Sequence, residues 1–251
     1  MKIVIHTLAL VFMLSTLSAA EKDSRCFELR TYYAAPGKLE ELHARFRNHT
    51  MKLFEKHGIA NVGYWMPMEN PESKLVYLLA YPNREARDKS WKGFMEDPDW
   101  KAAYKASEEK GKLVSKIEAT FLSATDYSPA IHVSTGPEAR VFELRTYKAS
   151  PGKLDNLHAR FRDHTLALFT KHGIGHFGYW VPIDKKSGAE DTLIYLLSHK
   201  SREAAAQSFK AFRDDRAWIT AKAESEKDGS LTAPDGVKSV FMIPTDYSPS
   251  K

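Results

Sequence analysis

The chain has 251 residues, of which 43% are apolar and 27% charged, a composition typical of a globular protein and unlike that of a disordered or fibrous one. Its formal charge of +5 comes from 37 basic and 32 acidic residues, which are interleaved along the chain without a basic run. We therefore predict a mixed, solvated surface and no binding of nucleic acid.

The N-terminus has the pattern of a secretory signal peptide. Lys2 precedes a short apolar stretch, Ile3 to Leu17, which ends in Ser18-Ala19-Ala20 before the chain turns polar. A positive start, an apolar centre and small residues before the cleavage site are typical of such peptides. We predict that residues 1–20 are removed by cleavage after Ala20 and that the protein is secreted or periplasmic. An uncleaved anchor is the weaker alternative because the apolar stretch is short and interrupted, so no stable membrane insertion is expected after cleavage.

Two segments of the chain are nearly the same sequence. Residues 27–67 and 142–182 align without gaps, and about 29 of the 41 aligned positions are identical. Such similarity indicates a duplicated unit rather than shared composition. The duplication predicts two modules, at residues 25–129 and 139–249, joined by a linker at 130–138 that contains Ser, Thr, Gly and Pro.

Hydrophobic periodicity predicts the element order β-α-β-β-α-β in each module. In the first module we expect strands at 26–33, 62–67, 75–81 and 116–122, a helix after Pro36-Gly37 that runs to about His57, and a second helical region that follows Asn83 and restarts at Asp97-Pro98. In the second module the equivalents are 141–147, 151–172, 178–182, 192–198, 202–227 and 239–243.

This order is the split βαβ, ferredoxin-like plan, in which one face of an antiparallel sheet carries both helices. The uncovered face needs a partner, so we predict an α+β fold whose tandem modules pack sheet to sheet as an intrachain pseudo-dimer. Higher association is left open. Successive strand residues point to opposite sides. We expect Phe27 and Leu29 beneath the helices, and Glu28, Arg30 and Tyr32 on the face between the sheets.

Four short sequences that occur in both copies resemble the NIPSNAP domain. They are Phe-Glu-Leu-Arg-Thr-Tyr, Pro-Gly-Lys-Leu, His-Gly-Ile and Gly-Tyr-Trp. The resemblance covers nearly all of the chain after residue 20 and implies a dimeric α/β-barrel fold. It implies little about activity and no catalytic residues, because the family is mostly uncharacterised. Its animal members are associated with mitochondria and with vesicle or mitophagy signalling, for which a secreted chain is a poor analogue.

The face between the sheets is the predicted ligand site. Buried charges must be paired or bound to a ligand. We therefore expect either ion pairs across the interface or an arginine-lined cavity for a small anionic or aromatic ligand, walled by one aromatic residue of each Tyr-Trp pair. The strand register leaves open which member of each pair points inward. The candidate residues are Glu28, Arg30, Tyr32, Tyr64, Trp65, Glu143, Arg145, Tyr147, Tyr179 and Trp180.

The sequence predicts no catalytic set, metal site or cofactor. Glycine-rich phosphate loops and a Gly-x-Ser-x-Gly elbow are absent from the sequence. His43 and His49 are six residues apart on different helix faces, which is not the spacing of a helix-borne zinc site. We interpret these duplicated histidines as packing and capping residues, and a haem-ligand role of His49 or His164 as the weaker alternative. Cys26, the only cysteine, aligns with Val141 and is expected to pack.

Two classes of function follow. The first is an exported, non-catalytic module that binds a small molecule in the inter-sheet cavity or interacts with a protein partner. The second is an enzyme resembling the cofactor-independent or haem-using monooxygenases that share this barrel. A cavity above about 300 Å³ with an unpaired Arg30 or Arg145 would favour ligand chemistry, whereas a filled interface with ion pairs such as Glu28–Arg145 would favour a scaffold.

Overall fold

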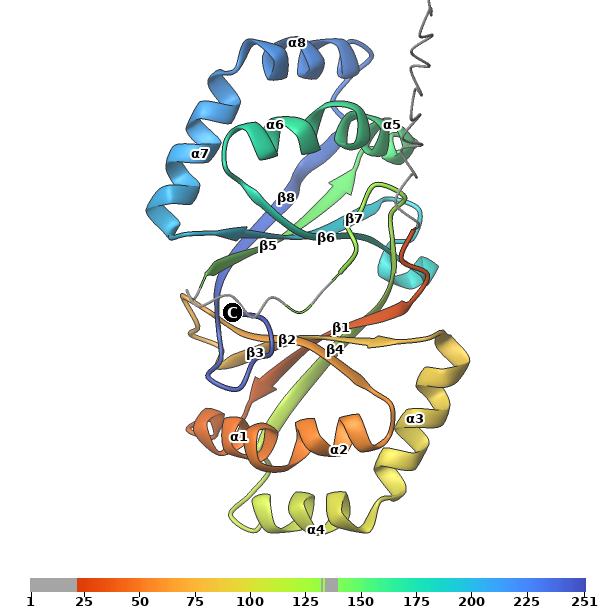
Figure 1. Cartoon of the computed structure of the whole chain (residues 1–251), viewed down its shortest axis with the longest axis vertical. Coiled ribbons are helices and arrows are strands. Elements are labelled where there is room, and N and C mark those ends of the chain that lie inside the picture. Colours follow the sequence, from red (N-terminus) through yellow and green to blue (C-terminus); the bar gives the residue numbers. More distant parts are fainter. Residues whose placement is uncertain (1–21, 132, 134–139) are drawn as a thin grey trace, which may run out of the picture.

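The computed structural model describes residues 22–131, 133 and 140–251. The predicted signal peptide and most of the predicted linker lie outside these residues. Two βαββαβ halves together form one closed barrel of eight strands, and the helices of each half cover its outer side at opposite ends of the molecule (Figure 1). No helix in the described part of the chain is long and apolar enough to cross a membrane.

The two modules repeat the same elements. The first contains β1 (Cys26–Ala34), α1 (Leu39–Arg45), η1 (Phe46–Thr50), α2 (Met51–Lys56), β2 (Ala60–Pro67), β3 (Lys74–Tyr81), α3 (Arg84–Glu96), α4 (Pro98–Ser107) and β4 (Val114–Ala124). The second contains β5 (Val141–Ala149), α5 (Leu154–Arg160), η2 (Phe161–Thr165), α6 (Leu166–Lys171), β6 (Gly175–Pro182), η3 (Lys185–Ser187), β7 (Thr192–His199), α7 (Arg202–Asp214), α8 (Arg216–Ser225) and β8 (Thr232–Pro244). The segments η1 and η2 are π-helical turns inside otherwise α-helical segments.

The strand order around the barrel is β1-β3-β2-β8-β5-β7-β6-β4, and every neighbouring pair is antiparallel. Two short contacts join the halves: β2 pairs with β8 at Trp65–Pro67, and β4 pairs with β6 at Leu122–Ala124. The prediction of tandem ferredoxin-like modules that pack sheet to sheet as an intrachain dimeric α/β barrel is confirmed.

The predicted assignment of the two faces of the first strand is wrong. Phe27 and Leu29 belong to the apolar cluster inside the barrel, whereas Arg30 and Tyr32 face the helices and Glu28 bonds to helix α3. The reason is that both faces of each sheet are covered. The face that meets the other sheet is sealed by apolar residues, and the charged set lies where the helices supply hydrogen-bonding partners.

The barrel interior is filled, so the predicted inter-sheet cavity is also wrong. Trp65 and Trp180 both point inward. The Trp65 ring lies 5.4 Å from that of Phe142, and the Trp180 ring lies 5.8 Å from that of Phe27. About 10 Å³ of open space remains between the sheets, which holds one water molecule at most. The interior is therefore a shared hydrophobic core and not a ligand site.

The segment after the last strand of each module crosses to the other module. We call residues 125–129 and 245–249 the tails. In the second tail, Asp246 accepts hydrogen bonds from Arg47 at 2.6 and 2.8 Å, and the Tyr247 hydroxyl lies 2.7 Å from Nδ1 of His43. The first tail makes the same contacts with the second module through Asp126, Tyr127, Arg162 and His158. Each module therefore completes the packing of its neighbour.

Candidate ligand-binding pockets

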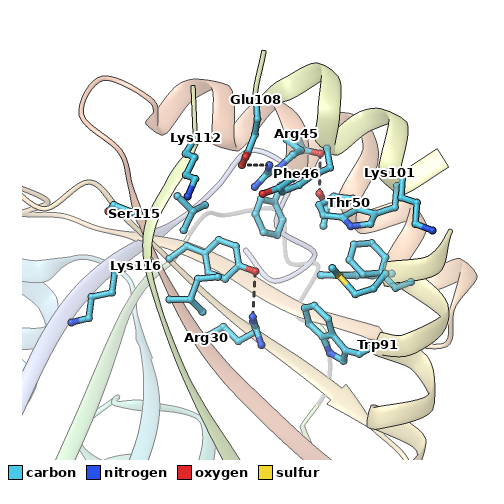
Figure 2. A pocket seen from close by; sticks show the side chains of 18 residues that line it. Arg30, Arg45, Phe46, Thr50, Trp91, Lys101, Glu108, Lys112, Ser115 and Lys116 are labelled. Atoms are coloured by element: carbon cyan, nitrogen blue, oxygen red, sulfur yellow. Dashed lines mark hydrogen bonds and ion pairs between the residues drawn. The ribbon is translucent and has the colours of Figure 1, made fainter. Parts of the chain in front are cut away.

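Each module has a pocket between the outer face of its sheet and its helices. The first pocket, in the first module, has a volume of about 750 Å³, and the second, in the second module, about 620 Å³. Both volumes lie within the range of small-molecule sites. Figure 2 shows the first pocket, in which Arg30 lies on the sheet side and Arg45, Phe46 and Thr50 lie on the helix side.

The sheet side of the first pocket is a closed ion network. Arg30 donates to Glu28, to the Tyr77 hydroxyl at 2.8 Å and to the Tyr32 hydroxyl at 3.3 Å. Glu28 also accepts two hydrogen bonds from Arg87, at 2.9 and 3.0 Å. Burial opposes the ionisation of Glu28, but the bonds from Arg87 and the charge of Arg30 outweigh it and hold the pKa of Glu28 below its usual value. The carboxylate is therefore ionised and paired within its own module, and not across the interface.

The second module builds the same network from different partners. Glu143 accepts from Arg145, lies 3.2 Å from Nε2 of His199, and accepts from the Ser239 hydroxyl at 2.5 Å. Burial again opposes ionisation, and the hydrogen bond from His199 together with the charge of Arg145 holds the pKa of Glu143 below its usual value. Arg145 also donates to two tyrosine hydroxyls, as Arg30 does. Both sheet-side arginines thus have their charge compensated by the protein.

The π-helical turns place residues in the pocket wall that the sequence pattern does not predict. A regular helix would put His49 on the buried stripe between Phe46 and Leu53. The extra residue in the turn instead turns Thr50 inward, where its hydroxyl donates to the Arg45 carbonyl at 3.2 Å, and leaves His49 exposed. His164 is exposed in the same way. Neither histidine lines the pocket between the sheet and the helices of its module. Single π-turns inside helices occur frequently at functional sites.

Arg45 is the most unusual polar group of the first pocket. Its side chain is only 4% exposed, and its Nη1 donates to Ser107 at 3.3 Å and to Glu108 at 3.2 Å. The guanidinium also lies 5.6 Å from the ring centre of Trp100. Its Nε atom is buried and has no hydrogen-bond partner within the described residues. A buried donor without an acceptor costs about 1–3 kcal/mol, which makes Arg45 the candidate residue of this pocket for binding an anion.

The second pocket repeats this arrangement. Arg160 is 5% exposed at its side chain, donates from Nη1 to Glu226 at 2.7 Å, and has a buried Nε that also lacks a partner in the described part of the chain. The Thr165 hydroxyl donates to the Arg160 carbonyl at 3.1 Å. The same buried arginine with the same free donor is present in both modules, so we regard it as a built feature of the fold.

The remaining wall of the first pocket is aromatic and its mouth is basic. Trp91 and Trp100 form the wall beside Arg30, whose guanidinium lies 4.5 Å from the ring centre of Trp91. Lys101 and Lys112 lie at the mouth and are exposed. A cavity with an apolar wall and cationic groups suits a molecule that has an apolar body and an anionic head.

The structure separates the predicted site residues into four groups. Arg30, Tyr32, Arg145 and Tyr147 line the two pockets. Glu28 and Glu143 lie behind them, and Tyr64 and Tyr179 are buried beneath the helices. Trp65 and Trp180 lie in the barrel. In each Tyr-Trp pair, the tryptophan is therefore the member that points toward the other sheet.

Sequence reasoning missed Arg45, Trp100 and Glu108, although their recurrence as Arg160, Trp218 and Glu226 was a usable signal. These residues lie on helices or, for Glu108 and Glu226, directly after one, where charged side chains are expected to face solvent and aromatic ones the core. Within the described ranges, no group of three or more His, Cys, Asp or Glu residues is placed to hold a metal ion.

Comparison with known proteins places both halves in one family. The NIPSNAP family model matches residues 27–129 and 142–249. Protein NipSnap homolog 3B of Mus musculus is 23% identical over 242 residues, which cover 92% of this chain and 88% of that protein. A NipSnap homolog of Dictyostelium discoideum is 22% identical over 142 residues, which cover 56% of each chain.

Solved structures share the fold at low sequence identity. A putative monooxygenase from Fusobacterium nucleatum has a TM-score of 0.58 at 11% identity, with 88% of this chain and 92% of that chain covered. An anthrone oxidase-like protein has a TM-score of 0.57 at 12% identity, with 94% and 97% covered. The match of the family model to both modules is decisive: the chain belongs to the NIPSNAP family.

Proposed function

We propose that this NIPSNAP protein is a non-catalytic binding protein for small amphipathic anions. The ligand would occupy the pocket between sheet and helices, with its anionic head on Arg45 and its apolar body against Trp91 and Trp100. The observation that carries the proposal is the buried Arg45 guanidinium, whose Nε lacks an acceptor beside a pocket of about 750 Å³. Arginine binds carboxylates with two parallel hydrogen bonds, and such bonds are stronger in a desolvated site.

Arg45 suits the head group better than Arg30 does. All three nitrogens of Arg30 already donate to Glu28, Tyr77 or Tyr32. Arg45 also pairs with a carboxylate, that of Glu108, but it donates to Glu108 and Ser107 through Nη1, and its Nε has no partner within the described residues. Arg30 would therefore shape and stiffen the sheet side of the pocket, and Arg45 would bind the ligand.

The proposal is tested by titration calorimetry of the chain that begins at Glu21, with naphthoate and dodecanoate as probes. Changing both Arg45 and Arg160 to Gln should weaken binding by at least about tenfold, since a hydrogen bond to a charged group contributes about 1.5–3 kcal/mol. Arg47→Gln is the matched control: Arg47 lies two residues after Arg45, in the π-turn, but contacts the second tail rather than the pocket, so this variant should bind both probes as the parent does.

Binding that is insensitive to the double substitution would overturn the proposal, as would failure of the parent chain to bind either probe. Loss of binding in all variants, the control included, would mean that the helix itself is disturbed. Thermal melts of each variant therefore accompany the titrations, and only variants that unfold cooperatively are compared.

The oxygenase alternative uses the same pocket. It is favoured by the arginine beside an aromatic wall, because a guanidinium that binds a carboxylate also stabilises an enolate or phenolate. The structural neighbours are described as a putative monooxygenase and an anthrone oxidase-like protein. We would measure oxygen uptake with anthrone, for which one molecule of O₂ yields anthraquinone and one of water. Uptake that disappears when both Arg45 and Arg160 are changed to Gln supports the alternative, and uptake no faster than in that double variant removes it for this substrate.

Export is the remaining part of the proposal. It rests on the apolar stretch that follows Lys2 and on the small residues that end at Ala20. Mass spectrometry of the protein recovered from outside the cytoplasm should give an N-terminus at Glu21. A chain that retains Met1 and stays in the cytoplasm would contradict it.

A further inference from the structure

We infer that the two pockets have diverged in ligand class. The first would prefer an anion with a charged group at each end, such as an α,ω-dicarboxylate, and the second a single-headed carboxylate with an apolar tail. The inference rests on the proposed function, because both classes would anchor on the same duplicated arginine.

The anchor is the same in both pockets. Arg45 and Arg160 are each held by a serine and a glutamate from the end of the last helical region, and each leaves a buried Nε without a partner among the described residues. Both arginines precede a π-turn of equal length. A head group of the same chemistry, a carboxylate, therefore fits either site.

The mouth of the first pocket has cations available for a second charge. Lys101 on α4 and Lys112 before β4 lie on either side of Arg45 in Figure 2. Neither lysine forms a salt bridge with any residue that the structure describes. Lys116, by contrast, is held by Glu118 at 2.6 Å. A ligand long enough to reach from Arg45 to the mouth would meet two uncompensated ammonium groups.

The second pocket has lost both lysines. Ile219 stands at the position of Lys101 and Ser230 at that of Lys112. Ile219 is 55% exposed at the edge of the pocket. Contact of this apolar side chain with water is unfavourable, and contact with the apolar tail of a ligand would be favourable. Two cations remain at this mouth. Lys222 lies 3.5 Å from Glu226. Arg213 lies on α7, at the position that Met95 has in the first pocket.

The test measures each pocket separately in the folded chain. Arg160→Gln leaves the first pocket as the only intact site, and Arg45→Gln leaves the second. Dodecanoate and dodecanedioate are titrated into each background by calorimetry at low ionic strength. We expect the affinity ratio of dodecanedioate to dodecanoate to be at least about tenfold higher in the first-pocket background, the effect of one added charge pair in a partly desolvated mouth.

Exchange of the mouth residues gives the matched control. In the first-pocket background, Lys101→Ile with Lys112→Ser should bring the two probes to similar affinities. In the second-pocket background, Ile219→Lys with Ser230→Lys should create a preference for dodecanedioate, and Arg213→Met should not remove the binding of dodecanoate. The preference should also weaken as salt is raised, because the exposed charges are screened.

The outcomes separate the two proposals. Equal probe ratios in both backgrounds, with binding still dependent on Arg45 and Arg160, would overturn the divergence and leave the proposed function intact. Binding that depends on neither arginine would overturn both.

Discussion

His43 shows how a tail controls the charge of a single residue. The ring lies against Tyr247 from the second tail, and burial lowers the pKa of His43. Its Nε2 atom is buried without a partner within the described residues. Burial lowers the pKa of His158 in the same way against Tyr127. Both histidines are therefore neutral in the folded protein near neutral pH.

This predicts acid sensitivity. Below the unfolded pKa of about 6.5, the unfolded chain binds protons that the folded chain does not, so the free energy of unfolding should fall as the pH decreases below that value. Urea denaturation between about pH 7.5 and pH 5 should show this slope, and changing both His43 and His158 to Gln should flatten it. Part of the slope should remain, since burial also lowers the pKa of His176.

Tyr247→Phe separates burial from the hydrogen bond. The phenyl ring still covers His43, so the pH slope should persist, while loss of the hydroxyl should lower stability at neutral pH by about 1 kcal/mol. A slope that vanishes in this variant would assign the effect to the hydroxyl rather than to burial.

From the sequence, we could predict which residues share a face of β1, but not whether that face points to the helices or to the other sheet. Alternation correctly grouped Glu28, Arg30 and Tyr32 on one face of β1, and the pairing of buried charges was expected. The face could not be chosen because the partners, Tyr77 and Arg87, come from β3 and α3, which alternation within one strand does not report. The near-continuous apolar run of β3, buried from Leu75 to Tyr81, was the available sign that both faces of the sheet are covered.

At the scale of elements, the π-turn η1 is the feature most directly tied to the pocket. Deleting the exposed Asn48 shortens the turn by one residue and restores α-helical spacing between Arg45 and Thr50. We expect stability within about 1 kcal/mol of the parent, because a backbone hydrogen bond replaces that of the Thr50 hydroxyl. Dodecanoate affinity in the Arg160→Gln background should fall by about tenfold, because Arg45 is displaced from its position in the pocket wall.

Deletion of Asp163, the equivalent exposed residue in η2, is the matched control. It should weaken binding at Arg160 and leave the first pocket as it is. Full binding after either deletion would show that the π-turn is not needed for binding of the anion at Arg45 or Arg160. The turn itself was not predictable, since Leu42, Phe46, His49 and Leu53 satisfy ordinary helical spacing and nothing in the residues signals the extra one.

At the scale of the whole molecule, the tails join the two modules in addition to the strand pairs of the barrel. Removal of residues 245–251 deletes the contacts of Asp246 and Tyr247, and also the Ser248 hydroxyl that accepts from the Tyr64 backbone N–H at 2.9 Å. We expect a loss of at least about 3 kcal/mol, comparable with the deletion of a buried aromatic side chain. Urea denaturation followed by tryptophan fluorescence measures it.

The variant Asp246→Asn shows how much of that loss comes from the ion pair with Arg47 alone. The Asp246–Arg47 pair is largely exposed, so this variant should be destabilised by about 1 kcal/mol or less. If the truncated chain unfolds at the same urea concentration as the parent, the second tail does not contribute to the stability of the first module.

Architecture was the level at which the sequence was most informative. The duplication and the strand–helix order were sufficient to predict two sheets packed face to face, because each sheet has one face that only another sheet can cover, and the family resemblance implied that they form a barrel. The pockets were not predictable, since they depend on how far α3 and α4 stand away from the sheet, and hydrophobic periodicity does not encode that distance.

The shared interior has an evolutionary consequence. In a homodimer encoded by one gene, every change at the barrel centre occurs twice and its energetic penalty is doubled. Here Trp65 meets Phe142, and Trp180 meets Phe27, through four independently encoded codons. A mutation in either half of the fused chain changes the barrel centre once, so its cost in stability is about half of that in the homodimer. Covalent fusion therefore lets the sequences of the two halves diverge while the fold is kept.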